Sequence, residues 1–580
     1  MASSLAKSGL SATPPAFAVK GAHNSLLLEM PGLGRNPPSG RLLRGLTPYL
    51  DEQGADHVFL LTERRRREEW NDGDRVVSYQ ELVHWERGAD GGVYRGVCTK
   101  NELLKREEIV QAFEYEPLSL IDWAARRMGA AIISSDRPLQ LESCIVPKPW
   151  GREIWYTGIE ARGVSRVRGD TGATDLPYAL GMFPVPIVGD REEAPLLLKV
   201  LDPLPDEIYG DLYLEVHREK WETYVVLSVD PSAWPDGAGV LMAGLHPDAV
   251  ENAGREKSGG GKNGKGKKPK AKSPRAISAK ARQAALGKAL KERITAYEKV
   301  RRDIDGRLDR ILRERGDDPD RPVPPELHRE LVRSLPKSLR AREQKLRGAV
   351  EEMLGRIPLR PGDVVTLPPG VLHSLRHGVK VIEFQTPTYE RLIAMFAQKV
   401  LTQPNWDVSE ALSAMEMSPY RPPETAMVHQ HNGVWVEQVV HFPQFQVHRT
   451  RMETNAFQDC HTGEGHRYRL LFITEGGGEM VLPSGETVTL TPESAFLLPA
   501  EMGAYTLLAT SGEGLTYLEA SPNPETASIP GETTENEHTA KENTAKENRT
   551  KENTAGKNTA GKNTGGEKTE NMDALLSKTW

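Results

Sequence analysis

The chain has 580 residues, which is too many for one hydrophobic core, so two or three domains are expected. Charged residues make up 27% of it and the formal net charge is only −6, which does not favour a specific nucleic-acid partner. The first residues lack the apolar core of a signal peptide, no apolar run approaches the roughly 20 residues that span a bilayer, and the three cysteines form no CxxC pair. We therefore expect a cytoplasmic protein that has no membrane association, and leave its oligomeric state open.

Residues 1–140 carry no motif that assigns them a role. HVFLLTERRRREEW is expected to be a strand that runs into a charged segment, and EEIVQAFEYEPLSLIDWAARRMGAAI is expected to be helical. At VPKPWGREIWY, residues 146–156, the pattern changes, and short apolar runs then alternate with turns as in an all-β barrel. One of these runs, LLLKVLD, has Lys199 in its middle, where an ammonium group is costly unless it pairs or meets an anion.

Residues 251–357 are expected to be a linker and a helical insertion. The Gly- and Lys-rich stretch GGGKNGKGKKPKAK predicts a flexible, disordered linker. Apolar residues at helical spacing follow over residues 276–313 and again near residues 326–356, where Pro336 interrupts the helix. We expect these helices on the outside of the barrel or over its mouth.

The C-terminal part divides into a β-rich segment and a tail. ERLIAMFAQKVL, which ends at residue 401, is helix-like, and residues 420–522 contain a second run of short strands and turns. From residue 523 the chain has five-residue near-repeats such as TAKEN with almost no apolar content, which predicts a disordered tail.

Two stretches carry the chemistry. In GDLYLEVHREKWE, residues 210–222, alternation predicts a strand with Glu215 and His217 on one face. A short turn and a second strand from Glu222 complete a predicted β-hairpin, which brings Glu222 to about 5 Å from His217. GDVVTLPPGVLH, residues 362–373, supplies His373 as a fourth group. Two carboxylates and two imidazoles predict a mononuclear metal site inside a β-barrel.

The same two stretches resemble the two cupin motifs. With KPWGREIW and LLLKVLD before them, they look most like the type I phosphomannose isomerase branch of the cupins. The resemblance implies a mainly β fold with two cupin (double-stranded β-helix) barrels. The metal-binding barrel would comprise residues 141–250 and 358–405, and a second barrel residues 420–522.

The resemblance also implies an activity and a set of roles. Such isomerases use Zn²⁺ to interconvert mannose 6-phosphate and fructose 6-phosphate through an ene-diol. The metal ligands would be Glu215, His217, Glu222 and His373. The phosphorylated sugar would be bound by Lys199, Lys220 and Arg391, of which Lys220 and Arg391 would also be catalytic. The sequence does not identify the base that transfers the proton.

One departure from the family keeps other functions open. Glu215 stands where the family has glutamine, and a set of two carboxylates and two histidines also suits Mn²⁺ or Fe²⁺. A cupin oxygenase that uses Fe²⁺ is one alternative, and a sugar-binding cupin that is no enzyme is another.

The second β-rich segment repeats the first motif in part. Gln446, His448 and Glu453 have the spacing of the first three ligands, but the position of His373 falls on Ala504. Because one ligand is missing, we expect no catalytic metal in the second barrel.

Overall fold

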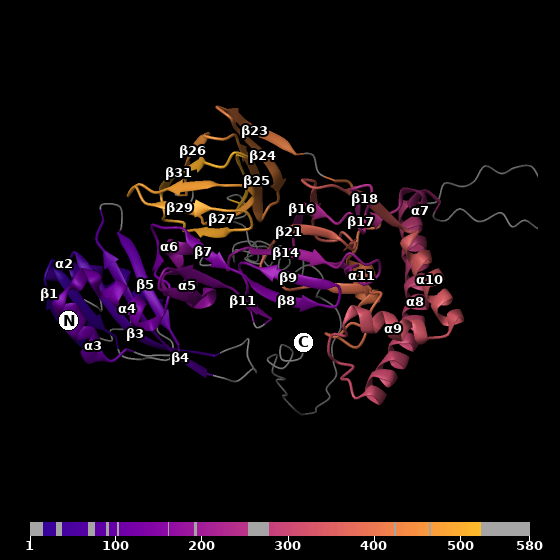
Figure 1. The fold of residues 1–580 in the computed structure, drawn as a ribbon, viewed down its shortest axis with the longest axis horizontal. Helices are drawn as coiled ribbons and strands as arrows, with labels where there is room; N and C mark the ends of the chain where they lie inside the picture. Colours follow the sequence, from indigo (N-terminus) through magenta and orange to yellow (C-terminus); the bar gives the residue numbers. More distant parts are fainter. Residues whose placement is uncertain are drawn as a thin grey trace, which may run out of the picture. The chain divides into compact units, whose positions relative to one another are not determined.

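The computed structural model describes residues 15–30, 38–67, 76–88, 92–100, 104–160, 162–190, 194–252, 278–422, 425–462 and 466–523. Most of the predicted linker and nearly all of the predicted tail lie outside these residues. The described chain is mainly β, as the sequence predicts, with strands in several sheets (Figure 1). No helix among the described residues is long and apolar enough to cross a membrane.

The N-terminal residues form a six-stranded sheet whose strands lie in chain order. β2 and β3 run parallel because helix α2 connects them. The apolar run of β3 is buried on both faces: Val58 packs with α2, and Phe59 with α3 and α4. The elements are β1 (Phe17–Gly21), β2 (Ser25–Glu29), α2 (Ser39–Gln53), β3 (His57–Arg67), β4 (Val76–Glu86), β5 (Val93–Thr99), α3 (Arg106–Tyr115), η2 (Pro117–Ser119), α4 (Leu120–Met128) and β6 (Ile133–Ser134).

Two sheets that share one buried core follow, and together we call them the first sheet pair. Their strand orders are β19-β16-β21-β14-β9-β8 and β18-β17-β20-β15-β22. The strands are β8 (Cys144–Lys148), β9 (Gly151–Trp155), β14 (Leu197–Pro203), β15 (Leu214–Val216), β16 (Glu222–Val229), β17 (Gly239–Leu245), β18 (Leu354–Leu359), β19 (Val364–Leu367), β20 (His373–Leu375), β21 (Val379–Gln385) and β22 (Leu392–Met395).

The predicted β-hairpin at residues 210–222 is wrong. β15 pairs with β20 and β22, whereas β16 pairs with β19 and β21 in the other sheet. The turn at residues 217–221 therefore carries the chain from one sheet to the other. Alternation locates a strand but not its partner, because the partners here lie about 150 residues further along the chain and are chosen by packing.

The predicted insertion consists of α8 (Ala279–Arg315), α9 (Pro325–Ser334) and α10 (Lys337–Glu351), with Pro336 between the last two. The first half of α8, including Leu290 and Tyr297, packs on the core of the first sheet pair. Its second half, including Leu308, packs on α9. Figure 1 shows the three helices together. The insertion therefore covers the outside of the first sheet pair.

The prediction of a helix in ERLIAMFAQKVL is also wrong. Its first apolar residues form β22, an edge strand that pairs with β15. A short buried apolar run fits a strand as well as a helix, and the free edge of β15 decided between them. The helix that follows is α11 (Val408–Ala414).

A second sheet pair is built around another core. Its strand orders are β13-β12-β7-β30-β27-β32-β25-β24-β23 and β26-β31-β28-β29. Strands from residues 139–175 thus extend a sheet that belongs mainly to residues 426–522. The strands are β7 (Leu139–Glu142), β12 (Arg166–Gly169), β13 (Gly172–Asp175), β23 (Ala426–His431), β24 (Val434–His441), β25 (Phe445–Met452), β26 (Phe457–His461), β27 (Arg469–Gly476), β28 (Gly478–Val481), β29 (Thr487–Leu490), β30 (Ala495–Leu498), β31 (Ala504–Ala509) and β32 (Leu515–Pro522).

Short elements connect these parts. They are β10 (Ile159–Glu160), β11 (Gly163–Val164), α5 (Leu176–Met182), α6 (Pro184–Val188) and α7 (Pro247–Asn252).

Candidate metal and substrate site

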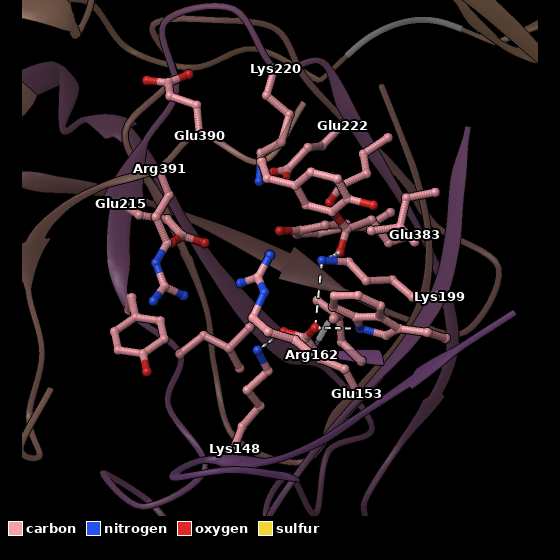
Figure 2. A pocket seen from close by; sticks show the side chains of 18 of the residues that line it. Lys148, Glu153, Arg162, Lys199, Glu215, Lys220, Glu222, Glu383, Glu390 and Arg391 are labelled. Atoms are coloured by element: carbon pink, nitrogen blue, oxygen red, sulfur yellow. Dashed lines mark hydrogen bonds and ion pairs between the residues drawn. The ribbon is translucent and has the colours of Figure 1, made fainter. Parts of the chain in front are cut away.

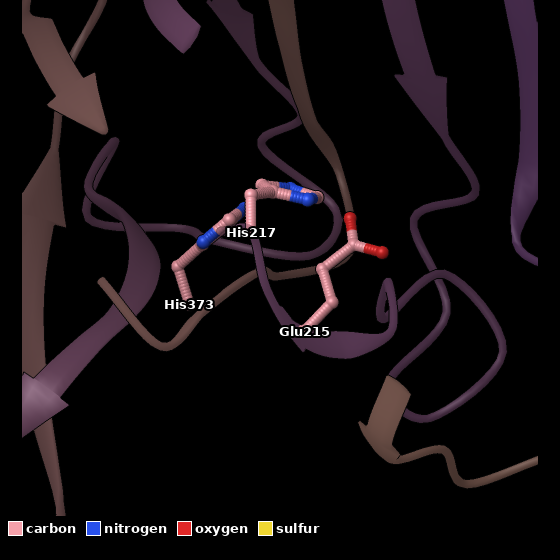
Figure 3. A group of neighbouring side chains, drawn as sticks. All are labelled: Glu215, His217 and His373. Atoms are coloured by element: carbon pink, nitrogen blue, oxygen red, sulfur yellow. The ribbon is translucent and has the colours of Figure 1, made fainter. Parts of the chain in front are cut away.

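Three of the predicted ligands converge within the first sheet pair. Glu215, His217 and His373 each offer a ligand atom, and these atoms lie within 4.8 Å of one another (Figure 3). Glu215 on β15 stands directly opposite His373 on β20 in the antiparallel ladder, and His217 immediately follows β15. The pairing of two strands distant in sequence therefore builds this group.

The fourth predicted ligand comes from the other sheet. Oε2 of Glu222, the first residue of β16, lies 3.3 Å from Nε2 of His217 and 3.3 Å from Nε2 of His373. Two atoms bound to one Zn²⁺ in tetrahedral geometry are also about 3.3 Å apart, given Zn–N and Zn–O lengths near 2.0–2.1 Å. Glu222 and His217 are close although the strands that carry them are not paired.

The hydrogen bonds of the two imidazoles leave the nitrogens that face Glu222 available. Nδ1 of His217 lies 2.8 Å from the carbonyl oxygen of Glu390, and Nδ1 of His373 lies 2.9 Å from that of Val371. A carbonyl oxygen only accepts, so each Nδ1 carries the proton and each Nε2 presents a lone pair. This is the arrangement that outer hydrogen bonds give to histidine ligands of metals.

Four buried atoms at this point make no hydrogen bond to any described residue: Nε2 of His217, Nε2 of His373, Oε2 of Glu215 and Oε2 of Glu222. Leaving a buried polar atom unsatisfied costs about 1–3 kcal/mol, and more for a charged one. Nitrogen and oxygen donors in this number suit a divalent transition metal. The four residues therefore fit a metal ion.

The protonation equilibria reflect charges of both signs packed close together. Burial would raise the pKa of Glu222, but Lys220 and His217 outweigh it and hold that pKa well below its usual range. Burial likewise opposes protonation of His373, yet Glu222 raises its pKa. Burial and Lys220 lower the pKa of His217, which keeps that imidazole neutral. A cation at this point would neutralise the carboxylates.

A cavity opens beside these residues, and Glu215 and Glu222 form part of its lining. Lys199, Lys220 and Arg391, which the family resemblance selects, all line it (Figure 2). Lys220 contacts Glu222 directly. The other ionisable residues of the lining are Lys148, Glu153, Arg162, Glu215, Glu222, Glu383, Tyr213, Tyr224, Tyr389 and Glu390.

Lys199 lies in a buried network of alternating charges. Its Nζ is 3.2 Å from Oε2 of Glu383 and 3.9 Å from Oε2 of Glu153. The other oxygen of Glu153, Oε1, lies 3.3 Å from Nζ of Lys148, and Oε2 of Glu153 accepts a hydrogen bond from Trp155. Burial lowers the pKa of Lys199, but the two carboxylates more than offset this, so its pKa is raised. Burial would raise the pKa of Glu153, but Lys148 and Lys199 hold it at about 2.

Glu383 behaves differently. Burial and the charge of Glu222 raise its pKa well above the usual range, although Lys199 opposes this. Its Oε1 is buried and makes no hydrogen bond to the described residues. Glu383 is therefore the carboxylate at the edge of the cavity whose affinity for a proton is raised.

The two arginines of the cavity have different partners. Arg162 contacts Glu160 and lies over the rings of Trp155 and Tyr389, with its Cζ 5.6 and 5.5 Å from their centroids. Arg391 lies 4.7 Å from the centroid of Tyr213 and donates a hydrogen bond of 3.0 Å to Thr402. No described carboxylate forms an ion pair with Arg391, so its charge is available to an anion.

Sequence reasoning missed several residues of the lining. Glu383 interrupts the apolar run of β21 as Lys199 interrupts that of β14, and the two are directly opposite in the ladder. An isolated charge in each of two apolar strands was a signal that could have found this pair. Lys148, Arg162 and Glu390 lie at strand ends and turns, where charged residues are common and give no such signal.

The second sheet pair holds the partial repeat of the motif. Gln446 and His448 are half-buried on β25, Glu453 is exposed beyond the strand, and Ala504 begins β31. Burial lowers the pKa of His448. That this sheet pair lacks a catalytic metal stays a prediction.

No family model matches this chain, and no curated protein matches it. It is similar in structure to a mannose 6-phosphate isomerase from Bacillus subtilis, with 16% identity, a TM-score of 0.43, and coverage of 66% of this chain and 99% of that one. It is also similar to a mutant phosphomannose isomerase from Salmonella typhimurium, with 15% identity, a TM-score of 0.44, and coverage of 67% of this chain and 99% of that one. A putative mannosephosphate isomerase from Archaeoglobus fulgidus shows 12% identity and a TM-score of 0.39, with coverage of 67% of this chain and 98% of that one. These TM-scores lie below 0.5, so the similarities do not assign an activity to this chain.

Proposed function

We propose that the protein is a metal-dependent aldose–ketose isomerase that acts on a phosphorylated sugar, of the mannose-6-phosphate isomerase type, and that each sheet pair is a cupin barrel. The observation that carries the proposal is the convergence of four unsatisfied ligand atoms beside a cavity lined by basic side chains. Glu215, His217, Glu222 and His373 would hold the ion. The sequence motifs that contain them support the same activity.

The charge of the cavity supports an anionic substrate. Five basic side chains and five glutamates line it, so their formal charges cancel. A divalent ion would bring the total to +2, which complements a phosphate monoester of charge near −2. Arg391 is the group best placed to bind the phosphate, because no described carboxylate pairs with it and a guanidinium binds phosphate through two parallel hydrogen bonds.

The other residues of the site have separate tasks. A bound divalent ion would act as a Lewis acid towards the oxygens of the substrate and stabilise charge that develops there. Lys220 adds a cation beside Glu222, where that charge develops. Lys199 stays protonated because its pKa is raised, so it contributes charge rather than acting as a base. Glu383 is positioned to hold the proton that moves between the two carbons of the ene-diol.

A second candidate function has its own observation. Glu215, His217 and His373 by themselves are a 2-His-1-carboxylate group, the ligand set of non-haem Fe²⁺ oxygenases. The basic lining favours the isomerase, because an oxygenase has no general need for cations around its substrate. A sugar-binding protein without activity would use the same cavity.

The test is metal analysis of the purified full-length protein, joined to a screen of hexose 6-phosphates for aldose–ketose interconversion. The expected result is one divalent metal per chain and interconversion of at least one hexose 6-phosphate, with no reaction of the unphosphorylated sugar. Oxygen consumption with Fe²⁺ in the absence of isomerisation would favour the oxygenase. Binding of the sugar phosphate without turnover would favour a sugar-binding protein that is no enzyme.

A further inference from the structure

One segment fastens the turn that carries two of the candidate ligands. Residues 386–395, which we call the strap, run beside residues 214–221. At one end, the N–H of Thr386 donates to the carbonyl of Trp221 (3.0 Å), and the N–H of Trp221 donates to Oγ1 of Thr386 (3.2 Å). At the other end, β22 pairs with β15. The strap is thus hydrogen-bonded at both of its ends to the segment that carries Glu215 and His217.

Glu390 ties the middle of the strap to the turn. The N–H of Arg218 donates to both carboxylate oxygens of Glu390, at 2.9 and 2.8 Å, and the N–H of Glu219 donates to one of them at 3.2 Å. Figure 2 shows this carboxylate directed away from the centre of the cavity. Hydrogen bonds from backbone N–H groups to an ionised carboxylate are about twice as strong as neutral ones. The carboxylate of Glu390 therefore binds the backbone of the turn and is not directed at a substrate in the cavity.

The backbone of the same residue reaches the metal site. The carbonyl oxygen of Glu390 accepts the hydrogen bond from Nδ1 of His217, which presents Nε2 of that ring towards Glu222. The next residue is Arg391, which lines the cavity. Glu390 is thus hydrogen-bonded to a candidate metal ligand, His217, and is bonded in the chain to the candidate phosphate-binding group, Arg391.

We infer that Glu390 is a positioning residue: its carboxylate clamps the strap to the turn and so sets both the orientation of His217 and the place of Arg391. This inference rests on the proposed function. Without the clamp, the carbonyl that orients His217 is free to shift, and Arg391 moves with it. Loss of such outer partners of a metal ligand lowers metal affinity about 10–100-fold.

The test compares the zinc affinity of the full-length protein, measured by competition with a chelator without substrate, in wild type, Glu390→Ala and Glu219→Ala. Glu219 is the matched control, because it lies in the same turn with an exposed side chain and its N–H remains. We expect Glu390→Ala to weaken zinc binding about 10–100-fold, and Glu219→Ala to leave it within threefold. Hydrogen exchange at the amides of residues 218 and 219 should accelerate only in Glu390→Ala.

A second measurement separates the two tasks. At saturating zinc, Glu390→Ala should regain kcat but keep a raised KM for the phosphorylated sugar, because excess metal refills the site and does not restore Arg391. An unchanged KM would overturn the role towards Arg391. If Glu390→Ala fails to fold, Glu390→Gln, which keeps one acceptor oxygen, should give smaller shifts in the same direction.

The outcomes also separate this inference from the proposed function. A wild type that binds no zinc overturns the proposed function. A wild type and a folded Glu390→Ala that bind zinc equally well overturn only the role of Glu390.

Discussion

Lys199 shows how single residues decide the chemistry of this site. A buried lysine is usually pushed towards its neutral form, but Glu383 and Glu153 keep this one charged. The carboxylates do not respond alike: the pKa of Glu153 is held at about 2, whereas that of Glu383 is raised. Two carboxylates near one ammonium therefore supply a fixed charge and a proton carrier.

His373 should be indispensable for metal binding. Replacing it by alanine removes one of the two imidazoles and leaves Glu222 without a partner in β20. We expect His373→Ala to lose its bound metal in elemental analysis of the purified protein. His448→Ala, which changes the histidine at the repeated position of the second sheet pair, is the matched control and should keep its metal. Unchanged metal content in His373→Ala would refute the ligand assignment.

Glu383 should be required for turnover but not for metal binding. Glutamine has nearly the same shape and cannot accept the proton, so Glu383→Gln should lower kcat about 10²–10⁴-fold. The metal content should stay at the wild-type value. A kcat within threefold of wild type would exclude Glu383 as the proton carrier.

At the scale of elements, the site depends on a change of sheet. β15 ends at Val216 and β16 begins at Glu222, and the turn between them brings ligands from facing sheets together. Because β20 and the strap come from the second half of the chain, the site requires segments from both sides of the insertion to come together. A pair of facing sheets thus serves as the frame on which distant segments place their side chains.

Asp211, just before β15, should make stability depend on pH. It accepts hydrogen bonds from Arg376 (2.8 Å) and His377 (2.7 Å), which follow β20, and although burial opposes it, Arg376 lowers its pKa from 3.8 to about 2. Since the folded pKa is below the unfolded one, the stabilisation is present above about pH 4 and is lost as the pH falls towards about 2. The shift corresponds to about 2 kcal/mol.

The measurement is the difference in unfolding free energy between wild type and Asp211→Asn as a function of pH. Taking the difference cancels the other carboxylates that titrate in this range. The difference should be about 2 kcal/mol near pH 6 and should shrink below pH 4. A difference that does not change with pH would show that the carboxylate of Asp211 contributes nothing through its charge.

Tyr297 should hold the insertion to the first sheet pair. Its ring is fully buried where α8 meets that core, and its hydroxyl donates to Glu343 of α10 at 2.8 Å. Tyr297→Ala should cost about 3–5 kcal/mol through the cavity it leaves. Tyr297→Phe, which loses only the hydrogen bond, should cost about 1 kcal/mol. Urea unfolding measures both, and equal costs would mean that the ring contributes little.

On the scale of the whole molecule, the described residues up to Pro522 form one compact unit. One core cluster joins Val58 of the N-terminal sheet, Val200 of the first sheet pair and Leu470 of the second. The N-terminal residues, to which the sequence assigned no role, therefore share their apolar surface with the sheets that follow. They contribute to stability whatever else they do.

Residues 524–580, the C-terminal tail, should be dispensable for metal binding and for thermal stability. Their composition offers almost no apolar side chains to bury. A protein that ends at residue 523 should keep its metal content and melt within about 2 °C of the full chain. Scanning calorimetry of the two proteins is the check, and a much larger fall would mean that the tail packs on the folded unit.

The sequence by itself located β14, β16 and the helical insertion, and it singled out the four candidate ligands together with Lys199, Lys220 and Arg391. Alternation and helical periodicity are local, so β14, β16, α8, α9 and α10 lie where the pattern puts them. Only the tertiary structure decided which strands pair. It separated β15 from β16, turned residues 392–395 into a strand, and brought Glu383 and Glu390 to the site. Strand pairing depends on packing between distant segments, and periodicity carries no information about that choice.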